Sequence, residues 1–268
     1  MIAVSFMTAN YVARRLGYKM SAGWSEGDRA TNTYFAPAAT YAERLDELLA
    51  GIAKLGFSRI DLWTAHLHWK WATDEHIQIA KRLVHKHHLS LQSYAGGFGD
   101  NRAEFEKACD TAAKVGIPLL GGMSSFLGAD PDGFGRILKE RGLKFGYENH
   151  PEKTPADLLK RIEGTDEEVV GAAVDTGWFG TWGYDAAQAI HAVRDRLFYV
   201  HLKDVLRAGS HETCRYGAGC VPIEKCVKTL KAIKYLGGVS VEHEPDSYDP
   251  SDDCRAGREM LERWLSEE

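Results

Sequence analysis

The chain has 268 residues, of which 44% are hydrophobic and 26% are charged, and its formal net charge is −5. This length and composition suit a globular protein with a sizeable core. A mildly acidic chain without a dense cluster of Lys and Arg lacks the positive surface that binds nucleic acids, so we expect no nucleic-acid partner.

The chain also lacks the sequence features of membrane and secreted proteins. No run approaches the roughly 20 apolar residues of a membrane span, and no basic segment precedes the first apolar run, as it would in a secretory signal. The five cysteines are odd in number and form no CxxC pair, which favours reduced thiols. We therefore expect a cytoplasmic protein without membrane contact.

Short apolar runs alternate with longer amphipathic segments along the chain. The apolar runs predict strands at residues 2–7, 59–63, 89–96, 117–123, 143–149, 169–175, 197–204 and 238–244. The amphipathic segments predict helices at residues 40–56, 73–87, 101–116, 131–142, 154–163, 184–195, 223–237 and 254–268. Eight strand–helix units match the size and order of a single (β/α)8 TIM barrel, with one domain over residues 1–268. An open doubly wound sheet is the alternative, but residues 6–15 lack its glycine-rich fingerprint.

A long connection separates the first expected strand from its helix. Residues 8–37 exceed the usual length of a βα loop. They carry the aromatic residues Tyr11, Tyr18, Trp24, Tyr34 and Phe35. We expect this loop to form a wall over a substrate or a contact with a second subunit.

Charged side chains end four consecutive strands. They are Glu148 and His150, then Asp175, then His201, Lys203 and Asp204, and finally Glu242 and Glu244. Parallel barrel strands bring their carboxyl ends to one rim, where reactive groups gather. Carboxylates crowded together repel one another unless a cation or protons compensate. Mixed oxygen and imidazole donors suit Mn²⁺, Mg²⁺, Co²⁺ or Zn²⁺, so we predict a divalent metal site at this rim.

Period-two alternation places Glu242 and Glu244 on one face of the last strand. We prefer Glu242 as the ligand because it directly follows the apolar run, and we expect Glu244 to hydrogen-bond a ligand or the substrate. The same alternation puts His150 nearer the mouth than Glu148, where it would move protons. Single residues of this kind are also common in solvated loops, and Lys203 would then form a surface ion pair with Asp204.

A second metal site is conceivable in the loop after the seventh strand. His211, Cys214 and Cys220 are near one another in sequence, but the usual spacing and a fourth ligand are missing. We interpret them as ordinary loop residues.

The segments "YENH", "VDTG", "VHLKDVLR" and "SVEHE" resemble the xylose isomerase-like TIM-barrel superfamily. That group contains sugar isomerases and epimerases, inosose and dehydroshikimate dehydratases, and repair endonucleases. The resemblance implies one divalent metal ion, Mn²⁺ first and Mg²⁺, Co²⁺ or Zn²⁺ as alternatives. Its implied ligands are Glu148, Asp175, His201 and Glu242.

The resemblance also implies roles in the reaction and in substrate binding. The two glutamates transfer protons in ketose 3-epimerases, and Arg207 stands where those enzymes have an arginine. Two positions depart from the epimerases, because Trp178 replaces a histidine and Thr154 replaces a glutamate. Simple ketose 3-epimerisation is therefore not implied.

Further candidates for substrate contact follow the second strand. Asp61 is expected to face inward, and His66 and His68 to reach the substrate, with an exposed loop as the alternative. Tryptophans fall near expected strand ends, where their faces suit a sugar pocket or plain packing; they are Trp63, Trp69, Trp71, Trp178 and Trp182. The predicted substrate-binding residues are Arg207, His66, His68, Trp178, Lys203 and Glu244.

These features predict a metal-dependent isomerase or epimerase that removes a proton next to the carbonyl of a sugar or cyclitol. Glu148, Glu242 or His150 would be the base. The alternative is a lyase or dehydratase acting on an inosose or 3-keto-glycoside, as a single chain or as one subunit of a hetero-complex. A repair endonuclease would need a positive groove, which this composition does not provide. A non-enzymatic sugar-binding barrel, a homo-oligomer and a partner subunit all stay open.

Overall fold

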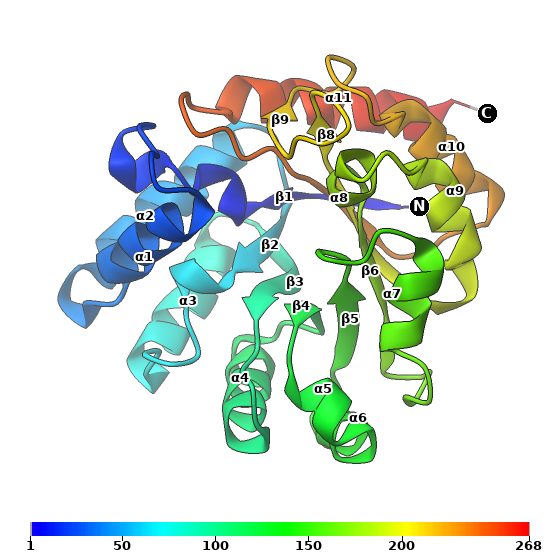
Figure 1. The fold of residues 1–268 in the computed structure, drawn as a ribbon. Coiled ribbons are helices and arrows are strands. Elements are labelled where there is room, and N and C mark those ends of the chain that lie inside the picture. Colours follow the sequence, from blue (N-terminus) through cyan, green and yellow to red (C-terminus); the bar gives the residue numbers. More distant parts are fainter. Residues whose placement is uncertain (1, 268) are drawn as a thin grey trace.

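The computed structural model describes residues 2–267 as a closed barrel of parallel strands. The strands pair in the order β1-β10-β7-β6-β5-β4-β3-β2, and the helices lie outside them (Figure 1). The barrel strands are β1 (Ala3–Met7), β2 (Arg59–Trp63), β3 (Ser90–Gly97), β4 (Leu119–Met123), β5 (Lys144–Glu148), β6 (Val170–Asp175), β7 (Leu197–Leu202) and β10 (Gly238–Val241). The expected (β/α)8 fold is confirmed.

The barrel strands are buried because the helices cover their outer faces and side chains fill the interior. All residues of β6 and β10 are buried. Inside the barrel, Ala173 packs with Leu119 and Tyr199. The small residue on β6 leaves room for the large tyrosine on the neighbouring strand, β7.

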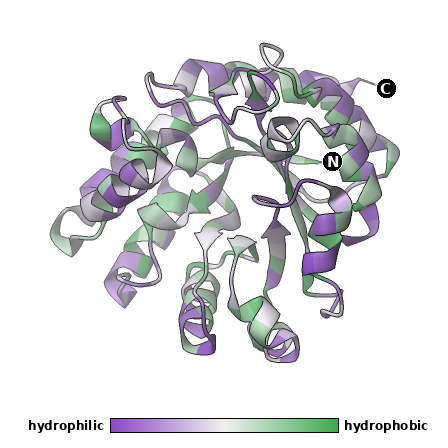
Figure 2. Ribbon diagram, in the orientation of Figure 1, coloured by the Kyte–Doolittle hydropathy of each residue, from purple (hydrophilic) through white to green (hydrophobic). Residues whose placement is uncertain are grey.

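An outer layer of helices follows the strands. They are α2 (Ala38–Lys54), α3 (Asp74–Lys86), α4 (Arg102–Val115), α6 (Pro131–Glu140), α7 (Pro155–Arg161), α9 (Ala186–Ala192), α10 (Ile223–Ala232) and α11 (Ser251–Ser266). Each corresponds to an expected helix, although α10 ends earlier; Glu268, the end of the last expected helix, lies outside the described residues. Hydrophilic and hydrophobic residues alternate along these helices (Figure 2), because one face packs on the barrel and the other meets solvent.

The helix starts follow from local capping chemistry. The Asn101 side chain accepts a hydrogen bond from the Glu104 amide at 3.1 Å at the start of α4. At α7, Thr154 and Asp157 form a reciprocal capping box and Pro155 occupies the first turn. Both caps satisfy backbone amides that have no partner within the helix.

The segment between β1 and α2 is more ordered than the expected loop. It contains 3-10 turns at Thr8–Tyr11 and Arg14–Leu16 and the helix α1 (Trp24–Phe35). Gly27 allows α1 to approach the earlier turn, since a Cβ there would lie 2.4 Å from the Val12 carbonyl oxygen. The indole rings of Trp24 and Trp63 are 5.1 Å apart, so this segment forms a wall at the end of β2.

The connection after β7 also has structure of its own. Strands β8 (Asp204–Val205) and β9 (Thr213–Cys214) pair antiparallel. The buried Asp204 carboxylate accepts hydrogen bonds from the backbone amides of Gly217, Gly219 and Val221 at 3.0–3.1 Å. These bonds hold the end of the hairpin against the barrel, so the residues between β8 and β9 lie near its mouth.

Two short helices were not expected from the sequence. They are α5 (Phe126–Ala129), after β4, and α8 (Thr176–Thr181), directly after β6. Among residues 2–267, no helix combines the length and the apolar character needed to cross a membrane.

Strands β3 and β4 approach each other closely at Gly96 and Gly122, which are paired. Gly122 has φ +149°, and a Cβ there would lie 1.9 Å from the Gly96 carbonyl oxygen. We expect Gly122→Ala to lower the free energy of unfolding by about 3 kcal/mol, because neither backbone can move without breaking sheet hydrogen bonds. Urea unfolding followed by tryptophan fluorescence measures this. Gly128→Ala in α5 is the control, since nothing lies within 4 Å of its Cβ position; equal stability of the two variants would contradict the prediction.

Candidate active site

The acidic side chains predicted from the strand ends are buried at one end of the barrel. Glu148 ends β5, Asp175 ends β6, His201 lies on β7 and Glu242 follows β10. Their exposed fractions are 6%, 0%, 1% and 5%, respectively. Carboxylates removed from water to this extent require positive charge or hydrogen-bond donors around them.

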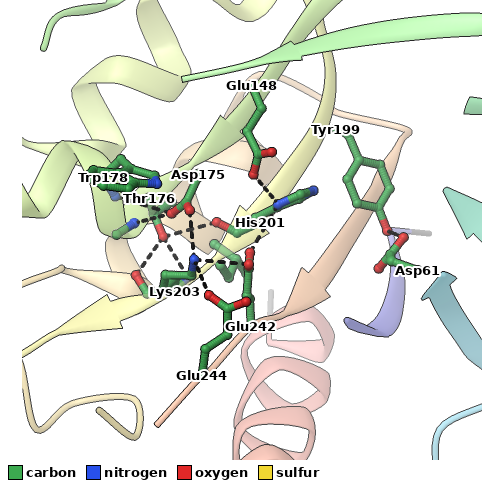
Figure 3. A network of polar contacts seen from close by, with 12 residues as sticks. Asp61, Glu148, Asp175, Thr176, Trp178, Tyr199, His201, Lys203, Glu242 and Glu244 are labelled. Carbon is green, nitrogen blue, oxygen red and sulfur yellow. Dashed lines mark hydrogen bonds and ion pairs between the residues drawn. The ribbon is translucent and has the colours of Figure 1, made fainter. Parts of the chain in front are cut away.

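His201 lies between two glutamates (Figure 3). Its Nδ1 atom is 2.7 Å from Glu148 Oε1 and 3.1 Å from Glu242 Oε2. Potential ligand atoms of these three residues all lie within 4.8 Å of one another. Yet neither ring nitrogen of His201, nor Glu242 Oε2, has a hydrogen-bond partner of good geometry. Buried polar atoms normally have hydrogen-bond partners. Carboxylate oxygens and imidazole nitrogens that converge without such partners suit the coordination of a metal ion.

Lys203 forms the second half of the cluster. Its Nζ atom lies 3.0 Å from Asp175 Oδ2, from Glu242 Oε1 and from Glu244 Oε2 (Figure 3). Lys203 is 3% exposed. It does not form the surface ion pair with Asp204 considered above, because Asp204 binds backbone amides instead.

The charges of this cluster stabilise one another. Burial alone would lower the pKa of Lys203, but Asp175, Glu242 and Glu244 outweigh it and raise that pKa well above 10.5. Burial would raise the pKa of Glu148, but the neighbouring His201 lowers it to about 2. For His201 the carboxylates of Glu148 and Glu242 overcome desolvation and raise the pKa well above 6.5. In this structure an imidazolium and an ammonium therefore compensate the carboxylates.

Asp175 has a different environment from the other three predicted ligands. Its Oδ1 accepts hydrogen bonds from the amides of Gly177 at 2.7 Å and Trp178 at 3.3 Å, which caps α8. Its Oδ2 faces Lys203. The structure thus brings Glu148, His201 and Glu242 into one group and links Asp175 to it through Lys203. Metal ligation by Asp175 stays a prediction.

The cluster opens into a cavity of about 450 Å³ at the carboxyl ends of the strands. Polar groups and aromatic or small apolar residues share its lining. The lining residues are Met7, Ala9, Trp24, Trp63, Ala95, Gly96, Gly97, Gly122, Met123, Glu148, His150, Trp178, His201, Lys203, His211, Glu242 and Glu244. A mainly apolar cavity with a few convergent polar groups is the usual form of a small-molecule site.

Several of the predicted site residues line this cavity. His150 has Nδ1 3.9 Å from Glu148 Oε2, and its ring is 5.4 Å from that of Trp178. Glu244 accepts a hydrogen bond from the Trp24 indole at 3.1 Å, so the wall formed by α1 is tied to the end of β10. Of the aromatic residues in the long segment, Trp24 lines the cavity; the wall over a substrate, or the contact with a second subunit, stays a prediction.

Three predicted substrate-binding residues do not line the cavity. His66 is buried, with Nδ1 3.0 Å from Thr8 Oγ1, and burial lowers its pKa to about 3. His68 accepts a hydrogen bond from the Lys70 amide at 3.1 Å. Arg207 is exposed between β8 and β9. His66 packs its ring against Phe35 and Trp63 and so supports the wall; substrate contact by these three residues stays a prediction.

Asp61 faces inward, as expected, but lies below the cavity. It accepts hydrogen bonds from Ser93 Oγ and Tyr199 OH, each at 2.6 Å, and from Ser5 Oγ. Burial raises its pKa, and these three hydroxyl groups oppose that shift. The Tyr199 ring lies 5.6 Å from the His201 ring, so this network borders His201 on the side away from Lys203 (Figure 3).

His211 is a cavity residue that sequence reasoning did not assign to the site. Its ring stacks on Trp178 at 3.7 Å and 15°, and its Nδ1 is 2.8 Å from Thr181 Oγ1. The Thr181 hydroxyl donates to the Gly177 carbonyl at 2.9 Å, so its oxygen accepts the Nδ1 proton and Nε2 is left as an acceptor. Burial, with Lys203 and His150 nearby, lowers the pKa of His211 to about 2. Only the β8–β9 hairpin places this residue, and no local sequence pattern marks it.

Among the described residues, no group of metal-ligand side chains includes His211, Cys214 or Cys220. All five cysteines are free thiols, and Cys214 is buried while Cys220 is exposed. Their interpretation as ordinary loop residues is incomplete, because His211 lines the cavity and Cys214 lies in β9.

Comparison with known proteins agrees with the barrel fold seen in the structure. The sequence profile of the xylose isomerase-like TIM barrel matches residues 49–264. The chain belongs to this family. An inosose dehydratase from Geobacillus kaustophilus is 31% identical over 129 residues, which make up 41% of this chain and 42% of that protein. One from Clostridium beijerinckii is 28% identical over 133 residues, 42% of this chain and 44% of that protein. This chain therefore spans less than half the length of these curated relatives.

Solved structures share the fold along nearly the whole chain. An IOLI protein with a bound zinc atom has a TM-score of 0.70 at 16% identity. The match covers 99% of the present chain and 98% of the IOLI chain. An L-ribulose 3-epimerase has a TM-score of 0.70 at 15% identity. The match covers 99% of the present chain and 95% of the epimerase chain. At this level of identity the likeness establishes the fold alone.

The raised pKa of His201 predicts a pH-dependent metal affinity. A cation must displace the imidazole proton, so we expect Mn²⁺ affinity to rise with pH between about 6 and 8, approaching tenfold per pH unit for one proton. Titration calorimetry in buffers of different ionisation enthalpy measures both the affinity and the released proton. His191→Gln, on the exposed side of α9, should behave like the unaltered protein. Affinity that does not change with pH would contradict an imidazolium at His201.

Proposed function

We propose that this protein is a divalent-metal-dependent enzyme that isomerises or epimerises a sugar or keto-sugar by removing a proton next to a carbonyl group. The observation that carries this proposal is the buried group of Glu148, His201 and Glu242 at the base of the cavity. Stability alone does not account for these charged residues, because apolar side chains would fill the barrel end without the free-energy cost of removing charges from water.

Glu148, His201 and Glu242 would hold the metal, with Asp175 as the fourth ligand. Mn²⁺ is the first candidate, with Mg²⁺, Co²⁺ and Zn²⁺ as alternatives, because carboxylate and imidazole donors suit all four. A bound divalent ion supplies positive charge that polarises the carbonyl and stabilises the oxyanion formed after proton removal.

Glu148 and Glu242 are the proposed acid–base pair. Strands β5 and β10 are separated by β6 and β7 in the barrel, so the two carboxylates reach the cavity from different sides. The low pKa of Glu148 keeps it ionised, as a base must be. Removal of the proton on one side and its return from the other would invert a carbon centre.

Other cavity residues would handle the proton and the hydroxyl groups. His150 lies beyond Glu148 towards the mouth and would exchange its proton with solvent or act as base itself. Lys203 would donate to a substrate oxygen, and His211 Nε2 would accept from a substrate hydroxyl. Trp178 and Glu244 would border the bound sugar.

A lyase or dehydratase acting on an inosose or a 3-keto-glycoside is the second candidate. Its support is the similarity to inosose dehydratases. The same proton removal leads to elimination when an oxygen substituent leaves the adjacent carbon. His150, beside the cavity, would then protonate the leaving oxygen.

Replacing Glu148 or Glu242 with Gln should lower the rate of proton exchange by about 1000-fold, because an amide can neither accept the proton nor ligate the metal as a carboxylate does. The measurement is deuterium incorporation from heavy water into a panel of an inosose, ribulose, allulose and 3-keto-glucose, with Mn²⁺ present. Glu43→Gln, an exposed residue of α2, is the matched control. Full exchange in both active-site variants, with unchanged thermal unfolding, would remove the pair from the reaction.

The products of the same incubations separate the two candidates. Isomerisation or epimerisation should give a product of unchanged composition that carries solvent deuterium. Elimination should give loss of water and an absorbing conjugated ketone. Mass spectrometry and ultraviolet absorbance read both outcomes, and elimination as the only outcome would favour the second candidate over the first.

A further inference from the structure

A second cavity lies beside the first, over the loops that follow β3 and β4. Its volume is about 520 Å³, and it extends from Gly97 to Arg161 on α7. The two cavities share two of their lining residues, Gly97 and Met123. They therefore meet where β3 and β4 end, on the side of the mouth away from the charged cluster.

Few side-chain atoms lie at the junction between the two cavities. A Cβ added at Gly97 would meet nothing within 4 Å, so this position opens into free space. The Gly97 carbonyl accepts a hydrogen bond from the Trp69 indole at 2.8 Å, which holds the backbone in place. Met123 contributes a flexible side chain that is 38% exposed. Of the two shared lining residues, Gly97 therefore has no side chain and Met123 has a flexible one.

The second cavity offers both polar and apolar groups. Ser125 Oγ donates to Asp100 Oδ1 at 2.9 Å, which leaves the other Asp100 oxygen free to accept. Arg161 uses Nε to bind Glu152 at 2.7 Å, so its terminal nitrogens are free to donate. Leu127 adds an apolar surface. Donors, acceptors and apolar area in one groove suit a hydroxylated ring, such as a second sugar or a phenolic group.

We infer that the substrate is a keto-glycoside whose keto ring occupies the metal-side cavity and whose attached group lies in the cavity between Gly97 and Arg161. This inference rests on the proposed function and deepens it by naming the substrate class. A free keto-sugar would use only the first cavity. Binding energy from the attached group would also help to orient the reacting ring.

The test fills the junction. Gly97 has no left-handed backbone conformation and no close neighbour, so Gly97→Leu can fold and project its side chain between the cavities. Ser125→Trp fills the second cavity from an exposed position instead. Gly51→Leu on α2, where a Cβ also meets nothing within 4 Å, is the matched control.

The probes are 3-keto-glucose and its para-nitrophenyl glycoside, titrated by calorimetry into protein with saturating Mn²⁺. We expect the glycoside to bind at least tenfold more tightly than the free sugar. Ser125→Trp, outside the first cavity, should remove that preference while changing affinity for the free sugar less than twofold. Gly97→Leu, which lies at the edge of both cavities, should weaken binding of the glycoside at least tenfold more than binding of the free sugar. Gly51→Leu should leave both affinities unchanged, and thermal unfolding should be similar for all variants.

The outcomes separate this inference from the proposed function. The inference is overturned if the free sugar and the glycoside bind with equal affinity, or if neither binds. It is also overturned if Gly97→Leu weakens the binding of both probes equally. Deuterium exchange into free 3-keto-glucose without preference for the glycoside leaves the proposed function standing alone. Selective glycoside binding without exchange or elimination supports the second binding site and overturns the proposed function.

Discussion

The mutual repulsion of buried carboxylates at the barrel mouth is the constraint on which the rest of the site depends. Four carboxylates lie close together and are shielded from water, so they need nearby positive charge to remain ionised. They belong to Glu148, Asp175, Glu242 and Glu244. His201 and Lys203 supply it in this structure. In the proposed metal-bound form, a divalent cation would take the place of the His201 proton and keep the carboxylates compensated.

The barrel turns this cluster into a pocket by making its rim asymmetric. Strands β5, β6, β7 and β10 carry or immediately precede the charged groups, whereas β3 ends in Gly96 and Gly97 and β4 ends in Gly121, Gly122 and Met123. Trp24 and Trp63 form one wall, beside β2, and Trp178 and His211 form another, beyond β6. In the order of the strands β2 and β6 lie on opposite sides. A ring-shaped ligand would therefore be bordered by aromatic groups, with its polar edge towards the metal ligands.

Family membership and the local geometry answer different questions. The family profile and the solved structures establish the barrel. The reactions named for similar proteins, dehydration of an inosose and epimerisation of a ribulose, can both begin with proton removal next to a carbonyl. What distinguishes such reactions is the shape of the substrate and the group placed beside its leaving oxygen. In this chain the cavity residues outside the acidic cluster include Trp178, His211 and the glycines Gly96, Gly97 and Gly122 of β3 and β4.

The sequence by itself determined the eight strand–helix units and the charged strand ends, since both are local patterns. Apolar periodicity reports burial within one segment, and a carboxylate directly after a buried strand lies at the rim of any parallel barrel. Only the tertiary structure decided that Lys203 faces Asp175 and not Asp204, that His66 supports a wall, and that His211 reaches the cavity. Each depends on contacts between residues far apart in the chain or on a hairpin of two-residue strands, and sequence periodicity carries no record of such contacts.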